Sequence, residues 1–399
     1  MDDSNRHDIT NLCYLSKWLE VKDDVVIFGA GAVGRGFIAR LVEGNGFTPV
    51  FVEADIELAR HLSEADGYIV HLTGAGKKDC HVSGYKVLTL EQGEEISKAL
   101  GNCLFATTAV GGQNLENIAL IIASAFTRAL IQRVEPLNIL LCENWPDAEK
   151  VLADALLKAG CQKDCFACVR CSVERMVRSG KNKLDLIAED GKPFYVDRQA
   201  WKGQQGNVVC GIEGLTFTDD IEAIYARKLF TSNAGGAALA YFGFLYDCKF
   251  LYEALAIPEI RKNLTELLNV AKQCLIVSFG LDEAGLERHL DELMNQRFPN
   301  RDLADTVHRV ARNPLRKLGS KERLAGLVHL LQRHALSTEP VSRVIGSALH
   351  YRDPTDAESL ELGRIIAQEG AGTILEDVCG FKRHETCFEE SLEFYDYYS

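Results

Sequence analysis

Lys228 and Asn233 are the residues whose types and spacing most directly suggest chemistry. They interrupt an apolar stretch, YARKLFTSNAGGAALAYFG, that runs from Tyr225 to Gly243. The spacing of its apolar residues predicts a helix over 225–243. Burial disfavours the charged form of a lysine and leaves it able to exchange a proton near neutral pH. Because an asparagine both donates and accepts hydrogen bonds, the pair suits a group that changes between alcohol and carbonyl.

The same stretch has a purely structural interpretation. A buried helix can carry a lysine whose aliphatic chain packs while its amine reaches solvent. Gly235 and Gly236 would then serve close packing of neighbouring helices. Taken alone, the stretch favours this interpretation, so the choice depends on the rest of the chain.

A glycine-rich turn near the N-terminus indicates a dinucleotide site. An apolar run that ends at Phe28 predicts a strand, and an amphipathic helix follows the glycines. The first glycine would allow the tight turn, the second the approach of a pyrophosphate, and the third the packing of helix on strand. Amides at the helix N-terminus would face the phosphates. The expected cofactor contacts are Gly29, Gly31, Ala32, Val33 and Gly34.

The next predicted strand, TPVFVEAD, ends with Glu53 about 20 residues beyond the first glycine, where an acid accepts the ribose hydroxyls. A carboxylate there repels a 2′-phosphate, so NAD is favoured over NADP. A solvated strand end is the alternative for Glu53, and the glycines make cofactor binding the better interpretation.

Two later strand ends are expected at the same crevice. NCLFATTAVGGQNL predicts a strand followed by a turn, and it places Thr108, Ala109 and Val110 along the cofactor. PLNILLCENWPD predicts another strand, with Asn144 at its end. Asn144 is either a substrate-facing group or the cap of the next helix, and position alone leaves the two even.

Length and composition describe a globular protein long enough for two or three domains. We expect an N-terminal extension over 1–22 with a short helix, a Rossmann-type α/β domain over 23–205, and a mainly α-helical domain over 206–399. The formal charge of −13 argues against nucleic-acid binding. No apolar run has the length of a membrane span, and the polar N-terminus is unlike a signal peptide. We therefore expect a cytoplasmic protein with a small-molecule substrate.

The thirteen cysteines are expected to be reduced thiols. Cys161, Cys165, Cys168 and Cys171 have spacings that could hold a metal. However, FACVRCSVERMV predicts a strand in which Cys168 and Cys171 point to opposite faces. The sequence therefore favours no metal site.

The stretch RVARNPLRKLGSKERL, residues 309–324, concentrates basic residues in an acidic chain. It is either a grip for a phosphate or carboxylate, with Arg316 and Lys317 as contacts, or a structural hub. The structural interpretation is the stronger one from this stretch alone.

Together these segments resemble the polyol-specific long-chain dehydrogenases, over nearly the whole chain after residue 22. The resemblance rests on FGAGAVGRGFI, TTAVG, PLNILLCEN, SVERMV, RKLFTSNAGGA, NPLRKL and SALHYR, in the family's order. It implies an NAD-dependent oxidoreductase that interconverts a secondary alcohol and a ketone, with Lys228 as general acid/base and Asn144 and Asn233 on the reacting oxygen. The substrate would be a polyol or sugar, expected to be phosphorylated, such as mannitol 1-phosphate or fructose 6-phosphate. The family also implies a monomer or weak oligomer. Candidate substrate contacts in the shared segments are Gly236, Arg175, Arg316, Lys317, His350 and Arg352.

One position departs from the family. Its helix usually carries a histidine three residues beyond the second asparagine, where this chain has Gly236. One interpretation is that the enzyme accepts a bulkier or different substrate in the space that the imidazole would otherwise fill. A redox-neutral lyase or epimerase that recycles bound NAD stays open as an alternative, and so does a non-catalytic NAD-binding protein.

Overall fold

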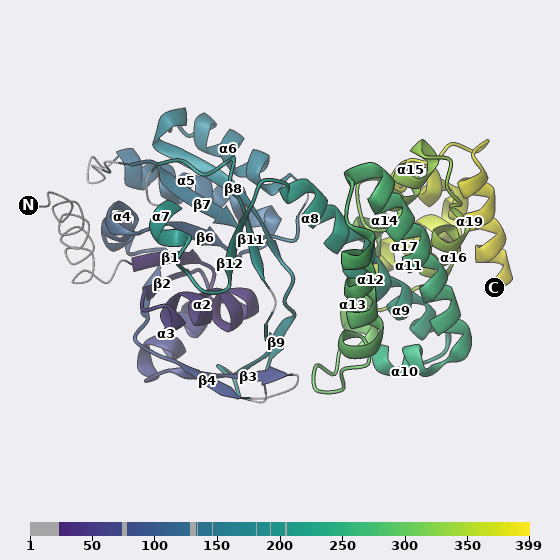
Figure 1. Cartoon of the computed structure of the whole chain (residues 1–399), viewed down its shortest axis with the longest axis horizontal. Coiled ribbons are helices and arrows are strands. Elements are labelled where there is room, and N and C mark those ends of the chain that lie inside the picture. Colours follow the sequence, from purple (N-terminus) through teal and green to yellow (C-terminus); the bar gives the residue numbers. More distant parts are fainter. Residues whose placement is uncertain are drawn as a thin grey trace, which may run out of the picture. The chain divides into compact units, whose positions relative to one another are not determined.

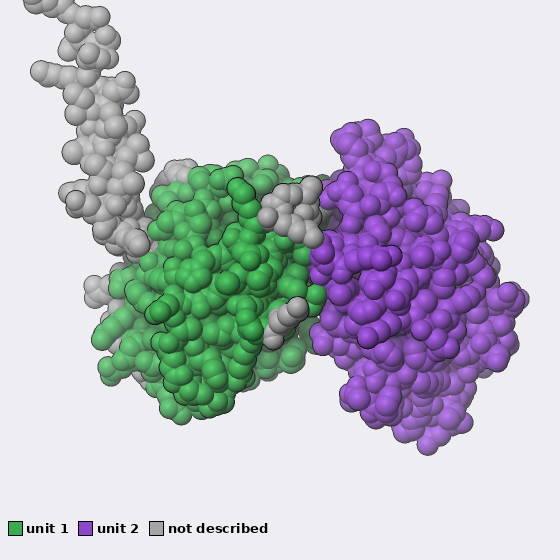
Figure 2. All heavy atoms as spheres, turned by 90° about the horizontal axis from the view of Figure 1, so that it is seen from below, with its two compact units in different colours: residues 1–221 green, residues 222–399 purple. Residues whose placement is uncertain are grey.

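The structure is a computed structural model that describes residues 24–73, 78–127, 133, 135–145, 147–180, 182–191, 193–203 and 206–399. The chain divides into two compact units, Met1–Ile221 and Glu222–Ser399, which Figure 2 colours separately. The short helix expected over 1–22 lies outside the described residues.

The first unit is built on an eight-stranded sheet in the order β12-β11-β8-β7-β6-β1-β2-β5. The six strands from β8 to β5 are parallel, and β11 runs antiparallel to β8. The central strand β1 turns Val25 and Ile27 into one core cluster and Val26 and Phe28 into another. A parallel strand that is buried on both faces must be apolar throughout, which explains its sequence. The strands of this sheet are β1 Asp24–Phe28, β2 Thr48–Glu53, β5 Lys86–Thr89, β6 Ala106–Thr108, β7 Leu137–Leu141, β8 Phe166–Val173, β11 Phe194–Asp197 and β12 Leu215–Thr218.

Helices cover both faces of this sheet (Figure 1). Helices α4, α5 and α6 pack on one face, while η1, α2 and α3 pack on the other. The order β5-β2-β1-β6-β7-β8 is that of a Rossmann fold, so the α/β prediction is confirmed. The helices of this unit are η1 Gly34–Ala39, α2 Arg40–Gly44, α3 Ile56–Glu64, α4 Gly93–Asn102, η2 Gly112–Asn114, α5 Leu115–Thr127, α6 Ala148–Lys158, η3 Lys163–Cys165 and α7 Gly206–Val209.

A second, four-stranded sheet in the order β4-β3-β10-β9 packs into the same core cluster as η1 and α2. The strands over Tyr68–Thr73 and Lys86–Thr89 lie close in the sequence but belong to different sheets. The first belongs to this smaller sheet and the second to the main sheet, a division that only long-range pairing decides. The strands of the smaller sheet are β3 Tyr68–Thr73, β4 Asp79–Val82, β9 Val177–Ser179 and β10 Leu186–Glu189.

The second unit is helical, as predicted, and it forms around α9. Every residue from Ala234 to Gly243 is buried, because α10, α11, α13 and α16 pack around this helix (Figure 1). Among the described residues, no helix combines the length and the hydropathy needed to cross a bilayer. The helices that begin at Ile221 and follow are α8 Ile221–Arg227, η4 Lys228–Asn233, α9 Ala234–Leu245, α10 Leu251–Ala256, α11 Pro258–Phe279, α12 Glu283–Glu292, η5 Leu293–Arg297, α13 Val307–Ala311, α14 Pro314–Leu318, α15 Ala325–Arg333, α16 Glu339–Ala348, α17 Ala357–Glu369, α18 Ala371–Thr373, η6 Ile374–Val378 and α19 Thr386–Tyr397.

Candidate active site

The turn from β1 into η1 requires glycine at two positions. Gly29 has a φ of 92°, and a Cβ on it would lie 2.6 Å from the carbonyl oxygen of Ala109. A Cβ on Gly34 would lie 2.1 Å from the carbonyl oxygen of Gly29. Gly31 is different, because no atom lies within 4 Å of the place where its Cβ would be. The loop therefore packs tightly at Gly29 and Gly34, whereas the space beside Gly31 is open. A ligand can approach the backbone there.

Helix geometry adds donors at this open position. Helical structure begins at Ala32 and continues through Val33 into η1. The first amides of a helix have no acceptor within the helix, so they can bind a phosphate.

Glu53 is fixed beside the same turn at the end of β2. Its carboxylate accepts hydrogen bonds from the amides of Ala30, at 2.6 Å, and Asp55, at 2.8 Å. The side chain is half-buried. Since a carboxylate can accept about four hydrogen bonds, lone pairs remain for ribose hydroxyls.

The loop after β6 is held by an acidic residue that the sequence analysis did not identify. Glu143 accepts hydrogen bonds from the amides of Val110 and Gly111, each at 2.9 Å. Thr108 ends β6 beside Leu141 of the parallel strand β7, so the two strand ends lie next to each other. The sequence shows an acidic residue just past β7. Its contact with the loop after β6 follows only from the pairing of β6 with β7.

The residue after Glu143 is the predicted Asn144. It is exposed just beyond the carboxyl end of β7. Behind it, the ring of Trp145 fills the space that a Cβ on Gly112 would need, with the nearest ring carbon 2.1 Å from that position. The Val110–Gly112 loop is thus fixed by Glu143 and packed by Trp145.

In the second unit, the helix predicted over 225–243 is present, but it is not regular. The segment Lys228–Asn233 is a π-helical turn between α8 and α9, and the amide of Ala234 donates to the carbonyl of Leu229. The hydroxyl of Thr231 donates to the carbonyl of Arg227 at 2.6 Å. A hydroxyl that bonds the carbonyl four residues back competes with the α-helical pattern and bends the helix.

This turn aligns the two residues that were expected to do chemistry. In an α-helix, residues five apart lie about 140° apart around the axis. A π-helical turn bonds residue i to residue i+5, so residues five apart lie much closer together around the axis than they do in an α-helix. Lys228 and Asn233 therefore share a face, and both are half-buried on a helix that is otherwise mostly buried.

The basic segment after α13 is tied together by internal bonds. Arg323 and Arg316 both pair with the carboxylate of Glu322, at 2.8 Å and 3.4 Å. Lys317 is only 4% exposed and its amine donates to the carbonyl oxygen of Arg312. Burial, reinforced by neighbouring arginines, lowers the pKa of Lys317 to about 6. Burial also lowers the pKa of Arg316.

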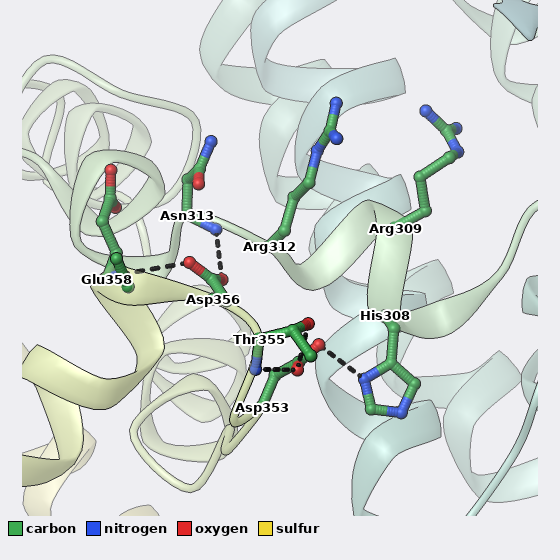
Figure 3. Close-up of a pocket in the computed structure, with 9 residues that line it drawn as sticks. His308, Arg309, Arg312, Asn313, Asp353, Thr355, Asp356 and Glu358 are labelled. Atoms are coloured by element: carbon green, nitrogen blue, oxygen red, sulfur yellow. Dashed lines mark hydrogen bonds and ion pairs between the residues drawn. The ribbon is translucent and has the colours of Figure 1, made fainter.

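A cavity of about 570 Å³ opens beside this segment (Figure 3). The carboxylate of Asp356 in its wall accepts from the amide of Asn313 at 2.7 Å. Asp353 accepts from Thr355 and pairs with His308 at 3.1 Å, and these bonds lower the pKa of Asp353 to about 2. The complete lining is His308, Arg309, Arg312, Asn313, Asp353, Thr355, Asp356, Ala357 and Glu358.

Two family models account for most of the chain. The mannitol dehydrogenase Rossmann domain matches residues 23–205, and the mannitol dehydrogenase C-terminal domain matches residues 220–369. The chain belongs to the mannitol dehydrogenase family. The resemblance inferred from the sequence motifs is thereby confirmed.

Individual members of the mannitol dehydrogenase family are similar to this chain over most of its length. Mannitol-1-phosphate 5-dehydrogenase of Arthrobacter sp. (strain FB24) is 34% identical over 89% of this chain and 93% of its own length. The enzyme of that name from Bacillus subtilis (strain 168) is 31% identical over 90% of this chain and 95% of its own length. Mannitol 2-dehydrogenase of Pseudomonas fluorescens, solved with NAD and D-mannitol, has the same fold, with a TM-score of 0.73 at 15% identity. That likeness covers 95% of this chain and 91% of the Pseudomonas chain.

The remaining predicted substrate contacts of this family member make internal contacts. A ring nitrogen of His350 lies 2.8 Å from the carbonyl oxygen of Tyr395. The guanidinium of Arg352 donates to the carbonyls of Leu349 and Tyr351, each at 2.8 Å. Both residues therefore brace the end of α16, whatever else they bind.

Arg175 belongs to the first unit, while His350 and Arg352 belong to the second. Its guanidinium lies 4.8 Å from the centre of the Phe37 ring. Burial, followed by the nearby charge of Arg40, lowers its pKa to about 10.

The clustered cysteines pack into the core. Cys168 lies against the cluster that contains α5 and α6, while Cys171 belongs to the cluster on the opposite face of the sheet. The strand β8 therefore separates them as its alternation predicts. Within the described part of the chain, no three His, Cys, Asp or Glu side chains gather closely enough to hold a metal ion.

Proposed function

We propose that this protein is an NAD-dependent oxidoreductase that interconverts mannitol 1-phosphate, or a closely related polyol phosphate, with its ketone, fructose 6-phosphate or the equivalent. The observation that carries the proposal is the π-helical turn Lys228–Asn233, whose geometry favours a shared face for its first and last residues. The relatives named mannitol-1-phosphate 5-dehydrogenase match over nearly their whole length, which supports the substrate class. From composition and family, we also propose a cytoplasmic monomer or weak oligomer.

The residues at the glycine turn fit NAD. The open space in front of Gly31 would receive the pyrophosphate, and the amides of the following helical turn would bind it. Glu53 would accept the adenine-ribose hydroxyls and would repel the 2′-phosphate of NADP. Thr108, Ala109 and Val110, which lead from β6 into the loop that Glu143 holds, would line the nicotinamide half of the cofactor.

Lys228 is proposed to move the proton of the reaction. NAD, when bound, supplies the acceptor for the hydride that leaves the carbinol carbon. The neutral amine of Lys228 takes the hydroxyl proton as the alcohol becomes a ketone. Asn233 donates an amide hydrogen to the reacting oxygen and stabilises the charge that develops there. From the family resemblance, Asn144 is proposed as the second amide on that oxygen. In the reverse direction, the ammonium of Lys228 returns the proton.

We propose Arg312 as the group that binds the substrate phosphate. Its backbone is held on both sides, because Lys317 donates to its carbonyl and the next amide, of Asn313, donates to Asp356. Its side chain is exposed at the cavity of Figure 3 and forms no ion pair within the described residues. Arg316 and Lys317, which the sequence suggested as contacts, would then act by stabilising the turn that presents Arg312.

A turnover assay tests this function. Purified protein is given NAD with mannitol 1-phosphate or mannitol, while NADH absorbance and product mass are followed together. We expect one NADH for each ketone formed, and strong preference for the phosphorylated polyol. Loss of water, or an isomer without NADH, would favour the redox-neutral alternative instead.

The variant Arg312→Ala tests the phosphate contact separately. It should raise the KM for mannitol 1-phosphate roughly tenfold or more, since a charge-assisted hydrogen bond contributes about 1.5–3 kcal/mol to binding. Turnover of unphosphorylated mannitol should stay at the wild-type level. An unchanged KM for the phosphate ester would remove Arg312 from this role.

A further inference from the structure

Arg35 follows the last glycine of the turn, and it is a buried charge held by carbonyl oxygens rather than by a carboxylate. It is only 5% exposed, and within the described residues its side chain forms no ion pair. Burial lowers the pKa of Arg35. A buried guanidinium disfavours folding unless its N–H groups find acceptors. The positions of those acceptors therefore indicate what this residue does.

Two consecutive carbonyls of the glycine turn are held by Arg35. Its Nε donates to the carbonyl oxygen of Ala30 at 2.6 Å, and its backbone amide donates to the carbonyl oxygen of Gly31 at 3.0 Å. The carbonyl and the N–H of a trans peptide point in opposite directions. With its carbonyl on Arg35, the Ala30–Gly31 peptide therefore points the N–H of Gly31 away from the guanidinium. That N–H makes no hydrogen bond within the described part of the chain.

Ala30 is bonded to opposite charges at its two ends. Its amide donates to the carboxylate of Glu53 at 2.6 Å, while its carbonyl accepts from the guanidinium of Arg35. Both peptides that flank this residue are thus fixed in orientation. The same arrangement places a cation and an anion in one short chain of hydrogen bonds across the turn.

The four-stranded sheet holds Arg35 in place from the other side. Its Nη1 donates to the carbonyl oxygen of Leu184, just before β10, at 2.6 Å. The hydroxyl of Tyr68 in β3 donates to the carbonyl of Arg35 at 2.9 Å. A Cβ on Gly36 would collide with Val177 of β9, so η1 lies tightly against this sheet. The guanidinium therefore joins the sheet to the glycine turn.

We propose that Arg35 is a positioning residue for the cofactor pyrophosphate. Its guanidinium, held by the four-stranded sheet, orients the Ala30–Gly31 peptide so that the Gly31 amide can donate to the pyrophosphate. Its positive charge, which no carboxylate contacts, offsets the negative charge of that group across a short distance of buried protein. The proposal rests on the NAD site of the proposed function and names the residue that keeps this site in its binding geometry.

Calorimetric titration of the full-length protein with NAD tests the proposal. Arg35→Met keeps much of the length of the side chain and removes its charge and its donors. We expect the Kd for NAD to rise roughly tenfold to a hundredfold, the usual effect of losing a hydrogen bond from a charged group. The Kd for ADP-ribose should rise by the same factor, because this ligand keeps the pyrophosphate and lacks the nicotinamide.

Arg133→Met is the matched control. The guanidinium of Arg133 also donates to two backbone carbonyls, those of Leu100 at 2.7 Å and Cys103 at 2.9 Å. The next amide after Cys103 bonds the first residue of β1, so this arginine serves the end of β1 opposite the glycine turn. Arg133→Met should lower the melting temperature and leave the Kd for NAD at the wild-type value.

Arg35→Lys provides a second, independent measurement if the neutral variant does not fold. A lysine keeps the charge, but its single amine cannot reproduce the planar fork that reaches Ala30 and Leu184. Its Kd for NAD should lie above the wild-type value by roughly threefold or more and below that of a folded Arg35→Met. A wild-type Kd in either Arg35 variant, or an equal loss of affinity in Arg133→Met, would overturn the proposal.

The outcomes separate this proposal from the proposed function. If the wild type binds NAD but oxidises no polyol phosphate, the proposed reaction is wrong, and the Kd values of the Arg35 variants still decide the role of this residue. If the wild type oxidises mannitol 1-phosphate and Arg35→Met keeps the wild-type Kd, only the role of Arg35 is wrong. A wild type that binds neither NAD nor ADP-ribose would overturn both.

Discussion

The carboxylate of Glu143 is a sensitive point for cofactor binding. It receives the amides of Val110 and Gly111, each at 2.9 Å, and so holds the loop that we expect to line the cofactor. Glu143→Gln keeps the size and shape of this side chain. It replaces one of the two acceptor oxygens with an NH₂ group, which then faces a backbone amide that also needs an acceptor.

The cost can be worked from these two bonds. A hydrogen bond to a charged group contributes about 1.5–3 kcal/mol, and a neutral one about 0.5–1.5 kcal/mol. The variant loses one charged bond and weakens the other. Because Glu143 is half-buried rather than buried, we take the lower end, roughly 1.5–2 kcal/mol. If the loop must be ordered to bind NAD, this corresponds to about a 10- to 30-fold weaker Kd.

Calorimetric titration with NAD and thermal melting measure the effect. Glu64→Gln is a matched control, since Glu64 is an exposed acid whose i,i+4 pair with Arg60 contributes only about 0.3–0.5 kcal/mol. The control should bind NAD as the wild type does. If Glu143→Gln also bound NAD with wild-type affinity, the loop would not depend on these bonds and our account of it would be wrong.

Two further predictions address the glycine turn and the buried lysine. Gly34→Ala places a Cβ 2.1 Å from the carbonyl oxygen of Gly29, so it should abolish NAD binding and lower the melting temperature. At Gly31 nothing lies within 4 Å of the place where a Cβ would be. Gly31→Ala should therefore melt at the wild-type temperature and lose only NAD affinity. Lys317 has a pKa of about 6 in the folded state, below its ordinary value of about 10.4. The unfolded chain therefore binds more protons between about pH 6 and pH 10, and stability should rise with pH across that window. Urea unfolding of Lys317→Met at several pH values should show a smaller rise, by up to about 1.4 kcal/mol per pH unit; an unchanged slope would mean that Lys317 is charged when folded.

Much of the first unit could be predicted from the sequence because its constraints are local. Gly34 is required because a Cβ there would collide with the carbonyl oxygen of Gly29 in the same turn, Gly29 has the positive φ of that turn, and Glu53 follows one strand later. Glu143 could not be found in this way. Its role depends on β7 pairing in parallel with β6, which brings two loops together from different parts of the chain.

The second unit shows where periodicity stops being informative. Apolar spacing predicts the helix over 225–243 but contains no signal for a π-helical turn. In the folded chain the Thr231 hydroxyl donates to the carbonyl of Arg227 within that turn, a side-chain bond that apolar spacing does not reveal. The burial of Lys317 could not be predicted from the sequence either, since only the folded chain places its amine against a backbone carbonyl. Whether the predicted site residues bind substrate stays a prediction.

The most direct test of the central claim is the oxidation of mannitol 1-phosphate by Lys228→Ala, with NAD affinity measured on the same preparation. We expect NADH formation to fall by about 10²- to 10⁴-fold, the usual contribution of a positioned acid/base, while the Kd for NAD stays at the wild-type value. A Lys228→Ala variant that forms NADH at the wild-type rate would show that this lysine does not move the proton.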